Sequence, residues 1–466
     1  MFDLIIKNGM IVTPCGTILG DLAVTGEKIM QIAEEIPEQS TITLDAEGKY
    51  LLPGLVDART HFSKMREGFD PAVELLQGSR AALFGGVTSI LEEPDPQGET
   101  SLSEQLSACR ELAEGHCYTD YGFHSLFQGF HPDFLDELKA MEEAGLSSLN
   151  ASLCGPHALK TEDLSRIFLC SAAAGQLLCI HPESGEAIAN LQRLMQNNHL
   201  SSPYFHAISR PNLTEAQAVA QALAAAAAAG DAPVYIQQIS CRESLEQIRA
   251  ARARGQQNIY AETCPHYLLL NSGCCAQGDA GARYVVEPPL RSPADTQAIW
   301  SALAGGVIQC LASDHYSYTL AEKENPRPDE KWNFHDCPPG IPGAEHRLDL
   351  LYHYGVSRGL LSIERLAAVC STNPARIFGL YPKKGVLAPG SDADIVIYDG
   401  EMPPHSLSSH GGSDYSPYAD RRVKGGVLSV LLRGKLLLDR GALLEERPRG
   451  CFLPRDKAFL DLENLL

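Results

Sequence analysis

Hydrophobic and polar positions follow two different patterns along the chain. In residues 1–50, and again after about residue 384, short apolar stretches are separated by turn signals such as Asn8-Gly9, which predicts small β-sheets. From Pro53 the pattern changes, and apolar strands alternate with helical stretches at intervals of about 30 to 40 residues, the length of a βαβ unit. The pattern therefore predicts an α/β domain that interrupts a β domain.

Eight apolar stretches in the α/β region predict the strands of one barrel. They cover residues 54–62, 88–93, 120–124, 148–154, 177–181, 234–239, 258–263 and 307–313. The clearest helix between them, 214–229, is rich in alanine and begins with Thr214 and Gln217 at the spacing of a capping box. Eight strand–helix alternations predict a (β/α)8 TIM barrel, in which the active site lies at the carboxyl ends of the strands.

The predicted domain division follows from the same change of pattern. Residues 53–384 form the barrel, and residues 1–52 and 385–466 together form a small β-sandwich domain from both chain ends. The tail after Gly450, which ends in residues 461–466, is either an oligomer arm or a surface segment.

The composition of the chain excludes some classes of binding partner. The formal net charge of −20 argues against broad binding to nucleic-acid phosphates. No stretch approaches 18 consecutive apolar residues, and the start of the chain lacks a signal-peptide layout. The 14 cysteines include no Cys-x-x-Cys spacing, and the neighbours Cys274 and Cys275 are interpreted as incidental. We therefore predict a cytoplasmic protein with reduced thiols and with neither a nucleic-acid nor a membrane partner.

One stretch, residues 51–62, concentrates candidate chemistry. After a buried apolar run and a Pro-Gly entry come Asp57, Arg59 and His61 at alternating positions. Because alternate residues of a strand share one face, we expect all three side chains to emerge together at the carboxyl end of this strand.

The stretch and a series of later motifs resemble the cyclic amidohydrolases, and the hydantoinase/dihydropyrimidinase branch in particular. The later motifs include Gly85-Gly-Val-Thr88, His181-Pro-Glu183, His206-Ala-Ile-Ser-Arg-Pro211, Cys264-Pro-His-Tyr267, Pro288-Pro-Leu-Arg291, Ser313-Asp-His315, Gly340-Ile-Pro-Gly343, Asn373-Pro-Ala-Arg376 and Pro389-Gly-Ser-Asp392. Each motif alone is weak, but their order and spacing along nearly the whole chain are specific. The resemblance implies an amidohydrolase-type barrel that opens cyclic amides.

In that family, the resemblance implies, two divalent ions share a bridging hydroxide and an aspartate moves the proton. The ligands are a His-x-His pair, a carboxylated lysine, two further histidines and that aspartate. In this sequence His61, His181 and Asp314 match three of these positions.

Three other ligand positions depart from the family pattern. Arg59 stands at the first histidine, Asn150 at the bridging lysine and Gln238 at the fourth histidine. Asparagine forms no carbamate, and a guanidinium adds a fixed positive charge where a cation would sit. We therefore expect no binuclear zinc centre with a carboxylated lysine. The cofactor is either none or a single divalent metal, zinc by preference, on His61, His181 and Asp314.

The substrate-contact positions have changed as well. Gly155 lies nearest to an expected tyrosine, Glu287 replaces a serine or asparagine, and Pro339 replaces an asparagine. Glu287 is either a general acid or base, or the partner of a basic neighbour such as Arg283 or Arg291.

Other polar groups have structural interpretations beside functional ones. Cys154 ends the fourth predicted strand, where packing is favoured over a nucleophile role. For His206, His266 and His315 a structural role is likewise favoured.

Arg59 leads to a specific structural hypothesis. We expect its guanidinium to replace the metal's charge and to fork onto Asp314 across the barrel mouth. The alternative is that Arg59 points to solvent or pairs with Asp57 or Glu92.

Two functions follow. In the first, the protein is a hydantoinase/dihydropyrimidinase-like homologue that has lost two-metal catalysis but retains a pocket at the barrel mouth, as a scaffold, regulator or ligand binder. In the second, it hydrolyses a C–N bond of a cyclic amide or ureide with one metal or none, and Asp314 transfers the proton. The expected partners are a small cyclic amide or ureide and further subunits. The subunits form a homo-oligomer, a tetramer by resemblance, or a hetero-oligomer with an active homologue.

Overall fold

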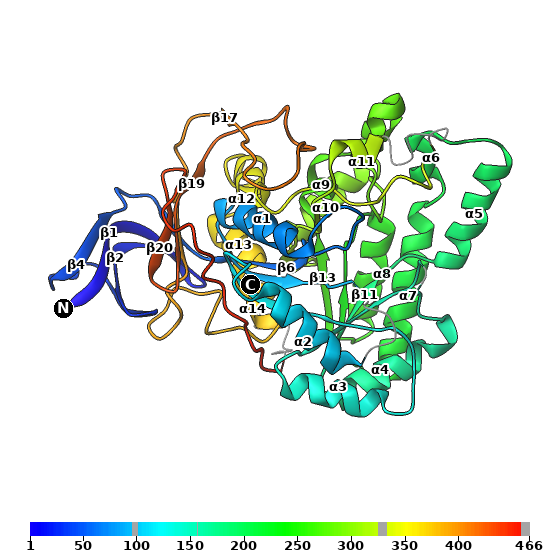
Figure 1. Cartoon of the computed structure of the whole chain (residues 1–466), viewed down its shortest axis with the longest axis horizontal. Helices are drawn as coiled ribbons and strands as arrows, with labels where there is room; N and C mark the ends of the chain where they lie inside the picture. The colour runs from blue at the N-terminus through cyan, green and yellow to red at the C-terminus, as the bar shows by residue number, and fades with distance from the viewer. Residues whose placement is uncertain (96–100, 156, 325–332, 458–466) are drawn as a thin grey trace.

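The computed structural model describes residues 1–95, 101–155, 157–324 and 333–457. Figure 1 shows two parts, a sheet at the left that carries the N-terminus and a larger body of helices around central strands at the right. Across these described ranges, no helix is long and apolar enough to cross a membrane. The last predicted segment, residues 461–466, lies outside the described residues.

The strands of the larger body pair in parallel and follow the chain order of a TIM barrel. They are β6 (Leu55–His61), β7 (Val87–Glu92), β8 (Asp120–Phe123), β9 (Ser125–Leu126), β10 (Ser148–Ser152), β11 (Leu177–His181), β12 (Val234–Ile236), β13 (Ile259–Thr263), β14 (Cys310–Leu311) and β15 (His315–Tyr316). One sheet has the order β14-β13-β12-β11-β10-β9 and the other β15-β6-β7-β8. Because β8 and β9 are consecutive pieces of the third strand, and β14 and β15 of the eighth, these two strands join the sheets. All eight predicted stretches therefore contain barrel strands.

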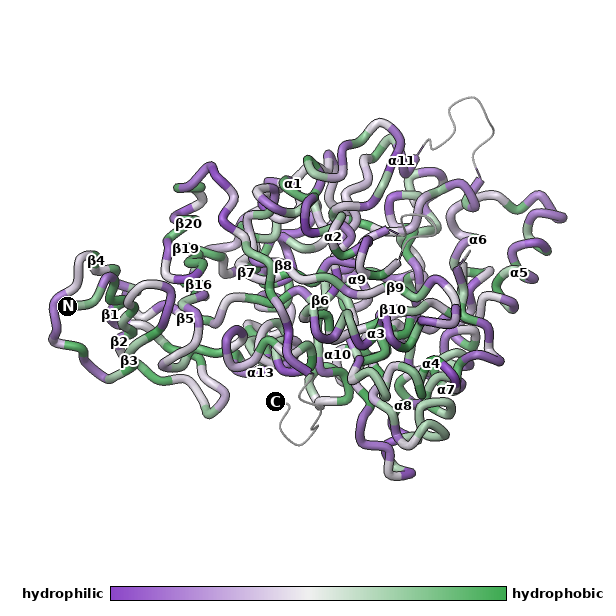
Figure 2. The backbone as a smooth tube through the Cα atoms, turned by 60° about the horizontal axis from the view of Figure 1, so that its bottom comes forward, coloured by the Kyte–Doolittle hydropathy of each residue, from purple (hydrophilic) through white to green (hydrophobic). Residues whose placement is uncertain are grey.

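Helices connect and cover these strands. They are α1 (Pro71–Phe84), α2 (Leu102–Ala113), α3 (Phe134–Glu143), α4 (Leu164–Ala173), α5 (Gly185–Asn197), α6 (Pro203–Ile208), α7 (Asn212–Ala228), α8 (Arg242–Ala253), α9 (Pro265–Leu269), α10 (Pro293–Ala304), α11 (Leu320–Glu324), α12 (Arg347–Leu351), α13 (Ile363–Ala367) and α14 (Asn373–Ile377). Figure 2 shows α7 with mainly apolar colour, and its buried alanines lie in the barrel core.

The predicted start of α7 is wrong. The helix begins at Asn212 with Pro211 at the N-cap, and the hydroxyl of Thr214 donates to the Pro211 carbonyl oxygen at 2.8 Å. The ring of proline fixes the backbone angle φ. Pro211 can therefore define the start of the helix, and no capping box at Thr214 is needed.

Strands from both chain ends join in one nine-stranded sheet. It contains β1 (Phe2–Thr13), β2 (Gly16–Thr25), β3 (Lys28–Ala33), β4 (Ser40–Asp45), β5 (Tyr50–Pro53), β16 (Ile395–Asp399), β19 (Gly426–Leu432), β20 (Lys435–Asp439) and β21 (Ala442–Leu443). The junction is β5, which pairs in parallel with β1 and antiparallel with β16. The short strands β17 (His405–Ser406) and β18 (Arg422–Val423) pair with each other.

The segment 450–456 lies against the barrel and not in this sheet. The backbone N–H of Tyr121 donates to the Cys451 carbonyl oxygen at 3.0 Å, and the N–H of Leu453 donates to the Tyr121 carbonyl oxygen at 2.7 Å. The N–H of Arg455 reaches the carbonyl oxygen of Gly145, in the turn before β10. The assignment of all of residues 385–466 to the terminal domain is therefore wrong for this segment, because its backbone groups pair with the N-terminal side of the barrel.

Candidate functional site

A cavity of about 390 Å³ opens at the carboxyl ends of the barrel strands. Its lining includes the four predicted pocket residues Cys154, Gly155, Glu287 and Pro339. Their role in binding a ligand stays a prediction, but all four lie in one cavity although they come from three separate parts of the chain.

Strand β6 brings two of its three alternating polar residues to this cavity. Arg59 and His61 line it, whereas Asp57 does not. Asp57 is fully buried deeper in the barrel, where its carboxylate accepts from the Ser313 N–H at 2.9 Å and lies 3.5 Å from Arg347. The expectation that all three emerge together is therefore wrong, because the strand carries its first polar residue below the mouth.

Arg59 lies between two carboxylates. Its Nε donates to Asp314 Oδ1 at 3.0 Å, and one terminal nitrogen lies 3.2 Å from Glu93 Oε2. The predicted contact with Asp314 is confirmed, but the guanidinium bridges two acids and does not fork onto one. The alternative partners Asp57 and Glu92 are not the ones it contacts in the described structure: Glu92 accepts from Thr60 and Ser63 instead.

Asp314 is surrounded by donors. Besides Arg59, His61 Nε2 lies 3.3 Å from Oδ1, and the Gln238 amide nitrogen donates to Oδ2 at 2.5 Å. Burial alone would raise the pKa of Asp314, but His61 and Arg59 outweigh it and lower the pKa to about 2. Asp314 and Gln238 both have positive φ, near 50°, a conformation that non-glycine residues hold only when their surroundings impose it.

Asn150 and Glu93 form the next part of the wall. The Asn150 amide donates to Glu93 Oε2 at 2.6 Å. Burial opposes ionisation of Glu93, but Arg59, with smaller contributions from His61 and Asn150, lowers its pKa to about 2. Glu93 is thus an ionised partner for Arg59 that the sequence analysis missed. The sequence signal for it is a second acid, next to Glu92 at the end of β7.

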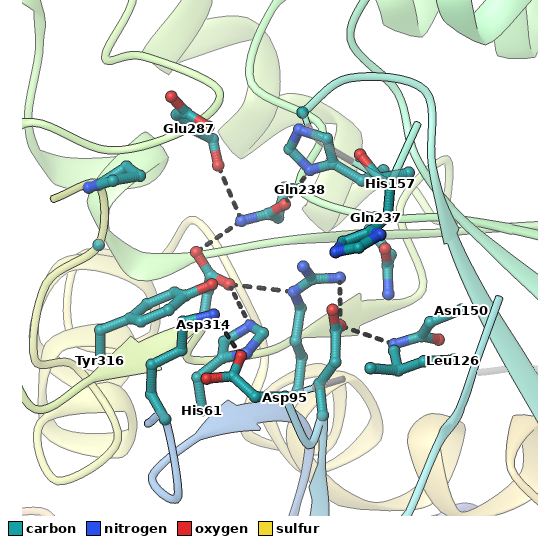
Figure 3. A pocket seen from close by; sticks show the side chains of 18 of the residues that line it. His61, Asp95, Leu126, Asn150, His157, Gln237, Gln238, Glu287, Asp314 and Tyr316 are labelled. Carbon is teal, nitrogen blue, oxygen red and sulfur yellow. Dashed lines mark hydrogen bonds and ion pairs between the residues drawn. The ribbon is translucent and has the colours of Figure 1, made fainter. Parts of the chain in front are cut away.

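Gln238 connects this wall to a second group of charges. Its amide nitrogen also donates to the Glu287 carbonyl oxygen at 3.0 Å, and its amide oxygen lies 2.7 Å from His181 Nδ1. Figure 3 shows Gln238 between Glu287 and Asp314, with dashed lines to both. Since both acceptors lie on one side of the amide, its oxygen faces His181.

His181 ends β11 beside a buried ion pair. Its Nε2 lies 3.2 Å from Glu183 Oε2, which also accepts from Arg210 at 2.6 Å. Burial would raise the pKa of Glu183, but Arg210 and His181 lower it. Arg210 also pairs with the side chain of Glu287. The predicted partners of Glu287, Arg283 and Arg291, are therefore wrong.

Those two arginines are engaged elsewhere, with Glu324 and Glu215 respectively. Arg210 reaches Glu287 from the segment between α6 and α7, a contact across 77 residues that no local pattern signals.

The remaining histidines of the motifs lie behind the site. His206 Nε2 contacts the Val286 carbonyl oxygen at 2.9 Å, and His315 Nδ1 accepts from the Gly343 and Ala344 N–H groups at 3.2 Å. The structural role predicted for both is confirmed. His266 is buried, and neither ring nitrogen has a hydrogen-bond partner among the described residues.

A family model described as the amidohydrolase family matches residues 50–437. The chain belongs to the amidohydrolase family. It is 36% identical to D-hydantoinase of Ralstonia pickettii over 462 residues, 98% of this chain and 99% of that protein. It is 35% identical to D-phenylhydantoinase of Escherichia coli over 456 residues, 97% of this chain and 98% of that protein.

Among solved structures, dihydropyrimidinase from Brevibacillus agri superposes with a TM-score of 0.93 at 32% identity, and the match covers 98% of this chain and 99% of that chain. These similarities confirm the predicted hydantoinase/dihydropyrimidinase resemblance and the TIM-barrel fold.

The two-ion group that the resemblance implies does not fit the residues at this mouth. It needs acceptors or anions, whereas Arg59 and Gln238 direct N–H donors at Asp314, and Asn150 directs its amide nitrogen at Glu93. A guanidinium has donors and no acceptor, and it keeps its charge at every physiological pH.

Proposed function

We propose that this hydantoinase/dihydropyrimidinase-like protein binds a compact cyclic amide or ureide in the barrel-mouth cavity without assembling the two-ion centre of its family. The observation that carries the proposal is Arg59, whose guanidinium lies between Asp314 and Glu93.

The charge balance at the mouth supports the proposal. Arg59 supplies one fixed positive charge to two ionised carboxylates. Two divalent ions in the same place would face this guanidinium within a few ångströms, and like charges so close in a buried site repel strongly. Asn150 and Gln238 cannot add the anionic charge that would offset it.

The hydrolytic alternative needs Asp314 to accept a proton. Its carboxylate already accepts from Arg59 and Gln238. Burial would raise its pKa, but His61 and Arg59 outweigh burial and lower the pKa to about 2. A carboxylate so stabilised in its ionised form is a weak base at neutral pH. The structure therefore favours binding over ring opening.

The cavity suits a small planar ring with polar edges. Its volume of about 390 Å³ lies at the lower end of the range of about 300–1,000 Å³ for small-molecule sites. Phe127, Leu126 and Tyr316 supply apolar walls. Asn150 Oδ1 is buried without a hydrogen-bond partner among the described residues, so it is a free acceptor for a ring N–H.

Metal content and ligand binding test the proposal together. Protein purified after growth with added zinc or manganese is analysed for metal, then titrated with hydantoin and dihydrouracil by calorimetry, with ring opening followed in parallel. We expect fewer than two metal ions per chain and binding without turnover. Replacing Asn150 with alanine should weaken binding, whereas the exposed α5 residue Asn190 gives a matched alanine control.

Two metal ions per chain would overturn the proposal. Ring opening that is abolished by Asp314→Asn would select the hydrolytic alternative instead. The cytoplasmic location and the oligomeric state remain predictions that this experiment does not address.

A further inference from the structure

We propose that Cys154, His181 and Glu183 form a site for one zinc ion in the cavity, on the far side of Gln238 from Asp314. The inference is independent of the proposed ligand, and it uses none of the residues around Arg59.

The three side chains come together because of the pairing of two barrel strands. Ser152 of β10 is in register with His181 of β11, so Cys154, two residues further on, lies beside the end of the neighbouring strand. One sulfur, one ring nitrogen and one carboxylate oxygen from the three residues all lie within 4.8 Å of one another, and all three residues are buried. Thiolate, imidazole and carboxylate are the ligands that zinc takes in proteins.

The second oxygen of Glu183 points to a missing cation. Oε2 is held by Arg210 and lies near His181, but Oε1 is buried without a hydrogen-bond partner among the described residues, and Glu183 is 0% exposed. A buried carboxylate oxygen without a partner costs free energy. A metal ion on Oε1 satisfies it while Arg210 continues to hold Oε2, the usual arrangement of a ligating carboxylate with an outer partner.

The orientation of His181 is that of a metal ligand. Because the Gln238 amide oxygen faces Nδ1 at 2.7 Å, Nδ1 carries a proton and donates it to this oxygen. Nε2 then faces Glu183 Oε2 at 3.2 Å. In the protein without metal, Nε2 donates its proton to this carboxylate, and a zinc ion at the cluster would take the place of that proton.

The charges balance when zinc is present. The Cys154 thiolate and the Glu183 carboxylate offset the two charges of the ion, and Arg210 is offset by Glu287. Cys154 and His181 both line the cavity, so the remaining coordination position of a tetrahedral ion is open to a ligand from there. A bound ring carbonyl or water is the class of group that it would take.

The experiment measures zinc on the full-length protein in the absence of any ring compound. Apoprotein is titrated with zinc against a chelator of known affinity, and zinc is replaced by cobalt, whose thiolate charge-transfer absorption reports a sulfur ligand. We expect one ion per chain and this absorption. Cys154→Ser and Glu183→Gln should each weaken zinc binding by more than roughly 100-fold, beyond the cost of losing an outer partner.

Two controls separate this site from others. Cys170→Ser changes a partly buried free thiol of α4 outside the cavity and should bind zinc like the unaltered protein. Asp314→Asn should also retain it, whereas loss of zinc in this variant would place the ion on His61, His181 and Asp314. The cobalt spectrum needs no variant, so the site remains testable if a substituted chain does not fold.

Three results would overturn the inference: no zinc bound, zinc bound without a cobalt–thiolate absorption, or unchanged affinity in both ligand variants. Absence of zinc together with alkylation of Cys154 at the rate of an activated thiol would indicate a nucleophile instead. None of these outcomes affects the proposed function, which fails if two ions bind, if the ring is opened or if no ring compound binds.

Discussion

Replacing Arg59 with methionine should strongly destabilise the fold. The Arg59 side chain is 6% exposed and contacts Asp314 at 3.0 Å and Glu93 at 3.2 Å. Methionine retains the apolar stem but leaves both carboxylates without their shared cation. Removal of one partner from a buried charge pair typically costs about 3–5 kcal/mol.

The shifts of the two carboxylates give a similar magnitude. The pKa of Asp314 falls from 3.8 to about 2, which corresponds to roughly 2 kcal/mol at neutral pH. The pKa of Glu93 falls from 4.5 to about 2, or roughly 3 kcal/mol, discounted because its side chain is 20% exposed. Burial opposes both shifts, and His61 and Asn150 contribute to them, so their sum of about 5 kcal/mol gives the order of magnitude of the effect of Arg59.

Urea unfolding followed by circular dichroism at pH 7 measures the effect. Arg249→Met, on the exposed face of α8, is the matched control and should stay within about 0.5 kcal/mol of the unaltered chain. The double variant Arg59→Met with Asp314→Asn should recover part of the loss, because the uncompensated carboxylate is removed. A stability of Arg59→Met equal to that of the control would refute the charge-bridging role.

Two further outcomes follow from buried groups away from the mouth. Burial raises the pKa of Glu262 to about 8, although Arg59 and the hydrogen bond from the Tyr235 hydroxyl act to lower it. The native state then holds a proton that the unfolded chain loses near pH 4.5, so stability should fall as pH rises from about 4.5 to 8, by at most about 5 kcal/mol. Glu262→Gln should remove that fall in urea unfolding at pH 5, 7 and 9, and parallel pH curves would contradict it. A chain ending at Gly450 should be less stable than one ending at Lys457 by roughly 4 kcal/mol, because it loses the hydrogen bonds of this segment and the burial of Leu453. Equal melting temperatures of the two chains would show that the segment contributes nothing to stability.

The parts of the site that the sequence predicted share a strand periodicity or a family motif. Arg59 and His61 follow from alternation along β6, and Asp314 from the Ser-Asp-His motif, so the sequence alone predicts their contact. Alternation gives the face of a strand but not the depth in the barrel, and this is why Asp57 was placed wrongly.

The charge partners that were missed come from elsewhere in the chain. Glu93 follows β7, and Arg210 lies between two helices, so neither is marked by spacing relative to the residue it contacts. Ion pairs across a barrel mouth depend on the paths of the loops that connect strands and helices. The periodicity of apolar residues does not predict those paths. The same limit applies to the segment 450–456, whose contacts with the barrel are made by backbone groups.

The position of that segment affects how the chain can be built. A protein is synthesised from its N-terminus, and domains generally fold as their residues emerge from the ribosome. Here the residues that pair with β8 lie more than three hundred positions later in the sequence. The third strand of the barrel is therefore covered only after residues 451–453 have been synthesised, and such distant pairing is slow. During that interval the edge of β8 is exposed, and we therefore expect the protein to need chaperones in order to fold.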